Sequence, residues 1–296
     1  MAFVPKGIIP PVVTPTRPDG TFNEDVFRRL IRHLVESGVH GIFPMGTTGE
    51  FYGFTEADYE RILTVAKEAA GGRVPVYAGT NSITPKGTIR LIRIAEKVGV
   101  DAVSVLTPMF VSQTQAEVYE YYRTVAASTD IPVIIYNNKP KTNVTVAPET
   151  VARLAEISNI VGVKDSTGDM TNTEEYIRLT RGREDFHVLL GRDTLIYAGL
   201  CYGASGAIAS CANVAPKLAV SIYENFMAGK RQAALDAQFA FAPLRIMANT
   251  GTFPEVIKEG LMLEGYDVGK CLAPIQELLP EQKKNLRRLL EQMKLI

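Results

Sequence analysis

The sequence predicts a (β/α)8 barrel with a small C-terminal helical extension. Eight short runs rich in β-branched residues alternate with longer stretches of helical periodicity. The runs are continuously apolar, which is typical of strands in a parallel sheet that is covered on both faces. Eight such units with no linker signal between them favour a closed barrel over a doubly wound sheet, in which roughly five or six strands are usual.

The strands and the helices between them can be placed in order. We expect strands at residues 7–13, 39–46, 74–80, 101–108, 131–138, 160–165, 186–193 and 205–211. Between the first two, residues 23–38 carry Val26, Leu30, His33 and Leu34 at a spacing that gives one apolar stripe on a helix. Residues 55–72 begin at the N-cap residue Thr55 and end in two glycines, which also favours a helix.

Two regions follow from this pattern. Residues 1–215 form the predicted barrel, which is the catalytic domain. After the eighth strand the chain continues with four helical stretches, and residues 216–296 are expected to complete the barrel and pack as an appendix.

Composition narrows the class of protein. The chain has 296 residues, 32 basic and 32 acidic, so its net charge gives no reason to expect nucleic acid or an anionic membrane as a partner. The three cysteines and three histidines are scattered without metal-site spacing, so we expect no metal. No apolar run reaches membrane-spanning length and no cleavable leader is evident. The prediction is a cytoplasmic protein that acts on a small molecule.

In a barrel of this kind, active sites lie at the C-terminal ends of the strands. The apolar run 160–163 ends in Lys164, and a lysine buried there would have a lowered pKa and could form a Schiff base with a ketone. Tyr136 could relay protons, Thr47 could extend the relay, and backbone amides around Thr47 and Thr48 could hold a carboxylate. No cofactor is needed. Alternatively, Lys164 is a solvated strand end, Tyr136 only packs, and residues 46–50 form a helix-capping turn.

Three motifs resemble those of a known family. GTTGE at 46–50, YNNKPKT at 136–142 and GVKDSTGD at 162–169 resemble signatures of the dihydrodipicolinate synthase and N-acetylneuraminate lyase family, in the family order. The resemblance implies a pyruvate-dependent class I aldolase on a TIM barrel, acting without a cofactor as a homotetramer built as a dimer of dimers.

The resemblance also assigns roles to individual residues. Lys164 is similar to the Schiff-base lysine and Tyr136 to the proton-relay tyrosine. Thr47 and Thr48 resemble the carboxylate-binding pair, and the carbonyl of Ile208 resembles the backbone group beside the pyruvyl unit.

Departures from the family pattern concern the second substrate. Phe110, which we expect to contact the substrate, stands where the synthases usually have a tyrosine that completes the relay across a subunit interface, and a phenyl ring cannot relay a proton. Lys141 replaces a common arginine and offers a point charge in place of a bidentate fork. The positions that bind inhibitory lysine in synthases are also changed, so we expect no inhibition by lysine; they are Glu56, Ile83, Gly87 and Met109.

Other residues point to a related aldolase. The Lys164–Asp165 pair resembles aldolases of 4-hydroxy-2-oxoglutarate and 2-keto-3-deoxy sugar acids, and the hypothesis is that Arg192, Ser166 and Lys141 engage a polar or anionic aldehyde portion. Arg192 could instead pair with Asp193 or with an acid at a subunit interface.

The predicted function is a lyase that joins pyruvate to such an aldehyde or releases it. The alternatives are 4-hydroxy-tetrahydrodipicolinate synthase and a 2-keto-3-deoxy acid dehydratase. A pyruvate-binding relative without turnover, and a phosphosugar isomerase or aldolase, are less favoured.

Overall fold

A computed structural model describes residues 3–296. Its centre is a parallel sheet with the strand order β1-β7-β6-β5-β4-β3-β2. Every pair of neighbours in this order is parallel. The strands are β1 Gly7–Ile9, β2 Tyr77–Gly79, β3 Ala102–Leu106, β4 Val133–Asn137, β5 Ile160–Asp165, β6 His187–Leu190 and β7 Gly206–Ile208.

The segment 39–46 closes this sheet into a barrel. It forms parallel bridges on both sides, from Phe43 to Pro11 and from Ile42 to Val76. The Val12 N–H donates to the Phe43 carbonyl at 3.0 Å, on the side of β1. Pro44 has no N–H to donate to β2, although its carbonyl still accepts from the Gly79 N–H at 3.1 Å, and the extended backbone ends at Met45, whose φ is +58°. The predicted eight-stranded barrel is therefore confirmed, with one strand reduced to single bridges.

The interior of the barrel is filled by one side chain from each of the eight strand segments. Together these side chains form a buried apolar cluster below the strand ends that carry Tyr136 and Lys164. The cluster consists of Ile9, Phe43, Tyr77, Ala102, Ile134, Val161, Leu189 and Ile208. The barrel is thus a packed core and not a pore.

A register shift in β5 brings Lys164 to the inner face. Val133 pairs with Ile160, but Ile134 pairs with Gly162, so β5 holds one extra residue at this point. Side chains normally alternate between faces along a strand, so Val161 and Lys164 would point to opposite sides. The extra residue lets both face the interior, because it reverses the alternation between them.

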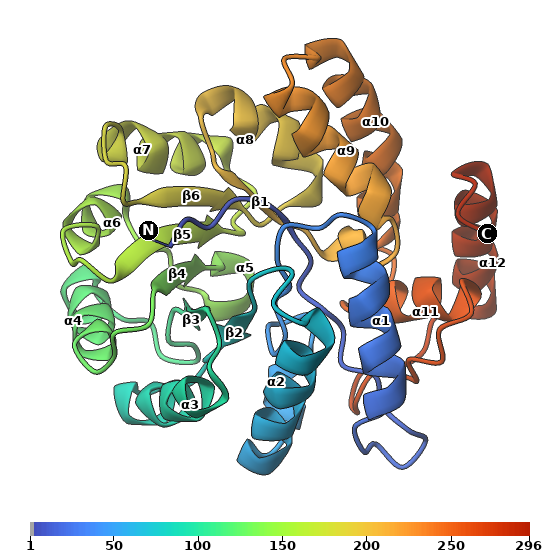
Figure 1. The fold of residues 1–296 in the computed structure, drawn as a ribbon, viewed down its shortest axis with the longest axis horizontal. Helices are drawn as coiled ribbons and strands as arrows, with labels where there is room; N and C mark the ends of the chain where they lie inside the picture. The colour runs from blue at the N-terminus through green and yellow to red at the C-terminus, as the bar shows by residue number, and fades with distance from the viewer. Residues whose placement is uncertain (1–2) are drawn as a thin grey trace.

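Helices surround the strands (Figure 1). The predicted N-cap at Thr55 is confirmed, since Thr55 and Asp58 form a capping box and the helix ends at Gly71 in the left-handed conformation. The helices are α1 Glu24–Glu36, α2 Glu56–Ala70, α3 Pro85–Val98, α4 Gln115–Ala126, α5 Lys139–Thr142, α6 Pro148–Leu154, α7 Met170–Thr180, α8 Ile196–Tyr202, α9 Pro216–Met227, α10 Arg231–Met247, α11 Glu255–Leu263 and α12 Pro280–Gln292. Three short 3-10 helices are η1 Phe51–Gly53, η2 Asp193–Leu195 and η3 Ser210–Asn213.

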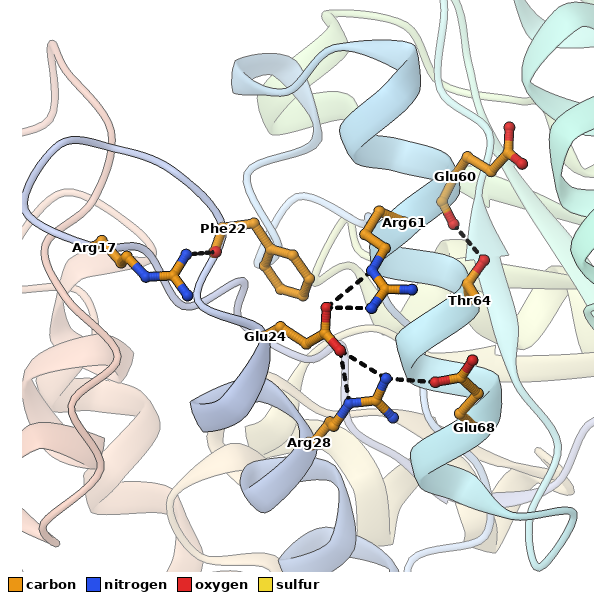
Figure 2. A network of polar contacts seen from close by, with 8 residues as sticks. All are labelled: Arg17, Phe22, Glu24, Arg28, Glu60, Arg61, Thr64 and Glu68. Atoms are coloured by element: carbon orange, nitrogen blue, oxygen red, sulfur yellow. Dashed lines mark hydrogen bonds and ion pairs between the residues drawn. The ribbon is translucent and has the colours of Figure 1, made fainter.

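Ion pairs tie α1 to α2 on the outer surface (Figure 2). The Glu24 carboxylate accepts hydrogen bonds from Arg28 on its own helix at 2.7 Å and from Arg61 on α2 at 2.6 Å. Arg28 also pairs with Glu68 on α2. Exposed pairs of this kind contribute roughly 0.2–1 kcal/mol each. They fix how the two helices lie against each other but do not approach the cavity described below.

The C-terminal helices extend the barrel on one side. Helix α9 packs against α8 and β1, and α10 packs against α9 and α8. Gln238 fixes α10 to the chain after β6, since its amide donates to the Asp193 carbonyl at 2.9 Å and accepts from the Tyr197 N–H at 2.9 Å. Helix α12 lies at the right-hand edge of Figure 1, across the molecule from α4 and α6. The division of the chain into residues 1–215 and 216–296 stays a prediction.

Among the helices of residues 3–296, none is both long and apolar enough to cross a membrane.

Candidate active site

A cavity of about 370 Å³ opens at the C-terminal ends of the strands. Most of the residues predicted for the site line it: Thr47, Thr48, Tyr136, Lys141, Lys164, Ser166, Arg192 and Ile208. They come from five different strand ends, so the fold brings together side chains that are far apart in the sequence.

Lys164 is a buried amine and not a solvated strand end. Only 4% of the residue is exposed. Its neighbour across the sheet is Tyr136, and Nζ lies 3.8 Å from the centre of the Tyr136 ring and 5.0 Å from that of Phe43. Burial lowers the pKa of Lys164, and attraction to the Tyr136 phenol opposes this only in part. A larger share of the amine is therefore unprotonated near neutral pH than for a free lysine.

The Tyr136 hydroxyl is the centre of a short polar chain. It lies 3.2 Å from Thr47 Oγ1 and accepts a hydrogen bond from the Asn138 amide at 2.8 Å. Burial by itself would raise the pKa of Tyr136, but the charge of Lys164 and the hydrogen bonds from Thr47 and Asn138 outweigh it, so the pKa lies below its ordinary value. The phenol is therefore held where it can exchange a proton with a group bound at Lys164.

Asn138 was missed by sequence reasoning. It lines the cavity and is buried. A signal for it was present, because Asn138 follows Tyr136 by two residues and side chains at that spacing share one face of a strand.

The GTTGE segment forms a tight turn. The residues on either side of Gly46–Gly49 both have positive φ, +58° at Met45 and +53° at Glu50. A Cβ on Gly49 would lie 3.0 Å from the Val12 carbonyl oxygen and 3.1 Å from the Met45 nitrogen, which is closer than side chains normally approach backbone and favours glycine there. Glu50 precedes η1 but makes no side-chain capping bond to it. The alternative of a helix-capping turn is therefore not supported.

Arg192 does not pair with Asp193. The Asp193 carboxylate instead accepts hydrogen bonds from the Ser210 hydroxyl at 3.1 Å and the Cys211 N–H at 2.8 Å, and it lies 3.7 Å from Arg245 Nε. The Arg192 guanidinium lies over Gly168, where a Cβ would come within 3.0 Å of Nε.

Arg245 belongs to the cavity although the sequence did not indicate it. Burial and the nearby charge of Arg245 lower the pKa of Arg192. Arg245 lines the same cavity from α10, and its Nη1 is buried without a hydrogen-bond partner in residues 3–296. Two guanidinium groups thus face one cavity.

The loop after α10 completes the wall. It contributes residues that no motif singled out: Ala248, Asn249, Gly251, Thr252 and Phe253. The expected C-terminal appendix therefore lines the cavity at its α10 end.

Asp165 faces away from the cavity. Its carboxylate accepts four hydrogen bonds, from the Asn137 amide, the Thr167 N–H, the Asn172 amide and the Thr173 hydroxyl. The resemblance of the Lys164–Asp165 pair to particular aldolases therefore reflects how the strand end is held and not a contact with substrate.

Phe110 lies outside the cavity of its own chain. It is not among the residues that line the cavity in residues 3–296, its exposed fraction is 93%, and its φ is +80°. Holding a phenylalanine in this conformation is unfavourable, and nothing in its own subunit explains it. Its predicted contact with substrate stays a prediction, and it requires a second subunit.

Two of the positions expected to have lost lysine binding line a separate cavity of about 220 Å³. There Glu56 forms an ion pair with Arg90, and Gly87 has no side chain to offer. The expected insensitivity to lysine stays a prediction.

Comparisons with known proteins bear on the family and the fold of the chain. A model of the dihydrodipicolinate synthetase family matches residues 4–293. The chain is 34% identical over 288 residues to the 4-hydroxy-tetrahydrodipicolinate synthase of Methanothrix thermoacetophila, with 97% of each chain covered. It is 35% identical over 272 residues to an uncharacterized DapA-like lyase of Halobacterium salinarum, which covers 92% of this chain and 88% of that one. The crystal structure of YagE from E. coli K12, a prophage protein of the dihydrodipicolinic acid synthase family in complex with pyruvate, superimposes with a TM-score of 0.94 and 31% identity, covering 98% of this chain and 99% of that one.

Proposed function

Because the chain belongs to the dihydrodipicolinate synthetase family, we propose that it is a lyase in which Lys164 forms a Schiff base with pyruvate and a carbon–carbon bond to an aldehyde is made or broken. The observation that carries this proposal is the buried Lys164 amine beside the Tyr136 phenol, with Nζ 3.8 Å from the ring centre.

The reaction needs no group from outside the chain. The unprotonated Lys164 amine adds to the C2 carbonyl of pyruvate, and loss of water leaves an imine. Loss of a proton from C3 gives an enamine, whose C3 bonds to the aldehyde carbon while the aldehyde oxygen takes up a proton through Tyr136. Hydrolysis of the imine then frees the product, and cleavage runs in reverse. Thr47 extends the proton path, and the turn at Thr47 and Thr48 holds the pyruvate carboxylate.

The aldehyde portion carries an anionic or strongly polar tail. Arg192 and Arg245 supply two guanidinium groups, and Lys141 adds an ammonium at the exposed edge of the same cavity. Ser166 lies beside Gly191, where any side chain would collide with the Ser166 hydroxyl. This lining suits a 2-keto-3-deoxy sugar acid or 4-hydroxy-2-oxoglutarate as the compound that is cleaved or formed, and its charge would equally suit the carboxylate of aspartate semialdehyde.

The second candidate is 4-hydroxy-tetrahydrodipicolinate synthase, in which aspartate semialdehyde is the aldehyde. The name of the relative from Methanothrix thermoacetophila favours it. Against it stand Lys141 in the place of the usual arginine and Phe110 in the place of the usual relay tyrosine. A dehydratase of 2-keto-3-deoxy acids would use the same imine. The homotetramer and the cytoplasmic location stay predictions.

A trapping experiment tests the shared step. Borohydride reduction in the presence of pyruvate should leave a stable adduct on Lys164, to be located by peptide mass spectrometry. No adduct there would rule out the Schiff-base proposal. An adduct without turnover of any aldehyde would instead identify a pyruvate-binding protein that has lost catalysis.

A substrate panel then separates the two candidates. Pyruvate release from 2-keto-3-deoxy sugar acids and 4-hydroxy-2-oxoglutarate should exceed condensation with aspartate semialdehyde. Efficient condensation with aspartate semialdehyde would establish the synthase in place of the first candidate.

Replacing Arg192 with alanine should raise KM for a 2-oxo acid with an anionic tail by about 10- to 100-fold, since a hydrogen bond between charged groups contributes roughly 1.5–3 kcal/mol. The rate at which pyruvate is trapped should not change, because the tail is absent from pyruvate. Arg183→Ala is the matched control, as this exposed arginine pairs with Asp185 away from the cavity. Equal KM values for Arg192→Ala and the parent would show that Arg192 does not bind the anionic tail.

A further inference from the structure

A fully buried ion pair joins the C-terminal region to the turn that carries Thr47 and Thr48. The Lys258 Nζ on α11 lies 2.6 Å from Glu50 Oε1, and both side chains have zero exposure. The Glu50 carboxylate closes the GTTGE segment, 208 residues away in the chain. None of the proposed catalytic steps uses either residue.

The pair is embedded in a set of backbone contacts. The other oxygen of Glu50 accepts a hydrogen bond from the Leu272 N–H at 2.6 Å, and Lys258 Nζ also donates to the Lys270 carbonyl at 3.0 Å. The Lys270 carbonyl in turn accepts from the Thr16 hydroxyl at 3.1 Å. The turn is therefore held against the segment after α11 by a fully buried ion pair and by partly buried hydrogen bonds to the backbone.

Burying a charge is costly unless it is paired, so a pair without solvent access favours one arrangement of the groups that carry it. Here that arrangement includes a strained backbone, because Glu50 has a φ of +53°, which non-glycine residues rarely adopt. The Glu50 N–H donates to the Thr47 carbonyl at 3.2 Å. A relaxation of Glu50 would therefore move Thr47, whose hydroxyl lies 3.2 Å from that of Tyr136.

We propose that Lys258 and Glu50 are positioning residues for the reaction: their buried ion pair sets the place of the Thr47 hydroxyl beside Tyr136 and of the Thr47–Thr48 amides that face the pyruvate carboxylate. This inference rests on the proposed Schiff-base function. If the proposal holds, the affinity for pyruvate depends on α11. Within residues 3–296, this helix contributes no side chain to the cavity lining.

The test must separate positioning from stability, since either single variant leaves a buried group without its partner. The double variant Glu50→Gln with Lys258→Met removes both charges and keeps similar side-chain volumes, and neutral replacements of buried pairs are often tolerated. The matched control is Glu259→Gln on the same helix, which breaks an ion pair of 2.9 Å to Lys283 and does not reach the turn. Each variant is compared with the parent in thermal unfolding and in the pyruvate concentration that gives half-maximal borohydride trapping.

For the double variant we expect a folded protein whose half-maximal pyruvate concentration rises roughly 10- to 100-fold, the size of effect that a displacement of about 1 Å in a binding group produces. Glu259→Gln should lower the unfolding temperature without changing that concentration. Parental trapping by a folded double variant would overturn this inference alone. If the double variant does not fold, Glu50→Asp takes its place with the same two outcomes, because it keeps both charges and shortens the side chain by one methylene group. Absence of any adduct in the parent would overturn the proposed function and this inference with it.

Discussion

Replacing Lys164 with alanine is expected to abolish the pyruvate adduct and to lower turnover by roughly 10⁴-fold or more, while the barrel stays folded. The amine is the atom that bonds to pyruvate, so no other group can take over the step at a comparable rate. The fold should survive because the change removes a buried amine that burial disfavours in its charged form. Mass spectrometry after borohydride treatment, steady-state kinetics and circular dichroism check the three parts of this expectation.

The matched control is Lys141→Ala, which removes the other lysine that lines the cavity and should leave the adduct in place. The pH dependence gives a second measurement on the parent. Because burial lowers the pKa of Lys164, the trapping rate should rise with pH as the amine loses its proton, and this rise should occur at lower pH than for a free lysine side chain. Parental turnover in Lys164→Ala, or an adduct on Lys141, would show that the wrong lysine has been assigned.

Replacing Tyr136 with phenylalanine should lower turnover by roughly 10²- to 10⁴-fold, the range attributed to general acid–base catalysis. The rate of pyruvate trapping should fall much less, because the Lys164 amine remains and only the proton path through the phenol to Thr47 is lost. Comparing the borohydride trapping rate with kcat for the aldol reaction separates these two effects.

Tyr77→Phe is the control for this change. Tyr77 belongs to the cluster that fills the barrel, and its hydroxyl is buried without a hydrogen-bond partner in residues 3–296. Removing the Tyr77 hydroxyl should change neither the borohydride trapping rate nor kcat. If Tyr136→Phe matched the parent in kcat as well as in trapping, Tyr136 would have no part in moving protons.

The strand ends explain why much of the site could be predicted. Lys164 and Tyr136 each terminate a continuous apolar run, and in a barrel such positions meet at one end. The run pattern itself depends on burial of both sheet faces, which leaves a strong signal in the sequence. Even the strand around Phe43, which pairs only through single bridges, was visible as an apolar run.

What could not be predicted depends on tertiary packing. Arg245 reaches the cavity because Gln238 fixes α10 to the chain after β6, and no local pattern encodes that contact. The sequence also did not reveal that the Asp165 side chain points away from the cavity. Its neighbour Lys164 points inward, and the register shift that decides this belongs to the pairing of β5 with β4 and not to β5 alone.

The lining of the cavity has a consequence for how such an enzyme can change over evolutionary time. The amine and the phenol sit on neighbouring strands of the rigid barrel, whereas Lys141, Arg192 and Arg245 lie on helices and loops outside the strands. Mutations in those outer segments can therefore exchange one acceptor for another without disturbing the bond to pyruvate. Descendants of one ancestral barrel can diverge in the aldehyde they use while retaining a common first step. A laboratory library confined to residues 139–141, 192 and 245–253 would explore the same freedom.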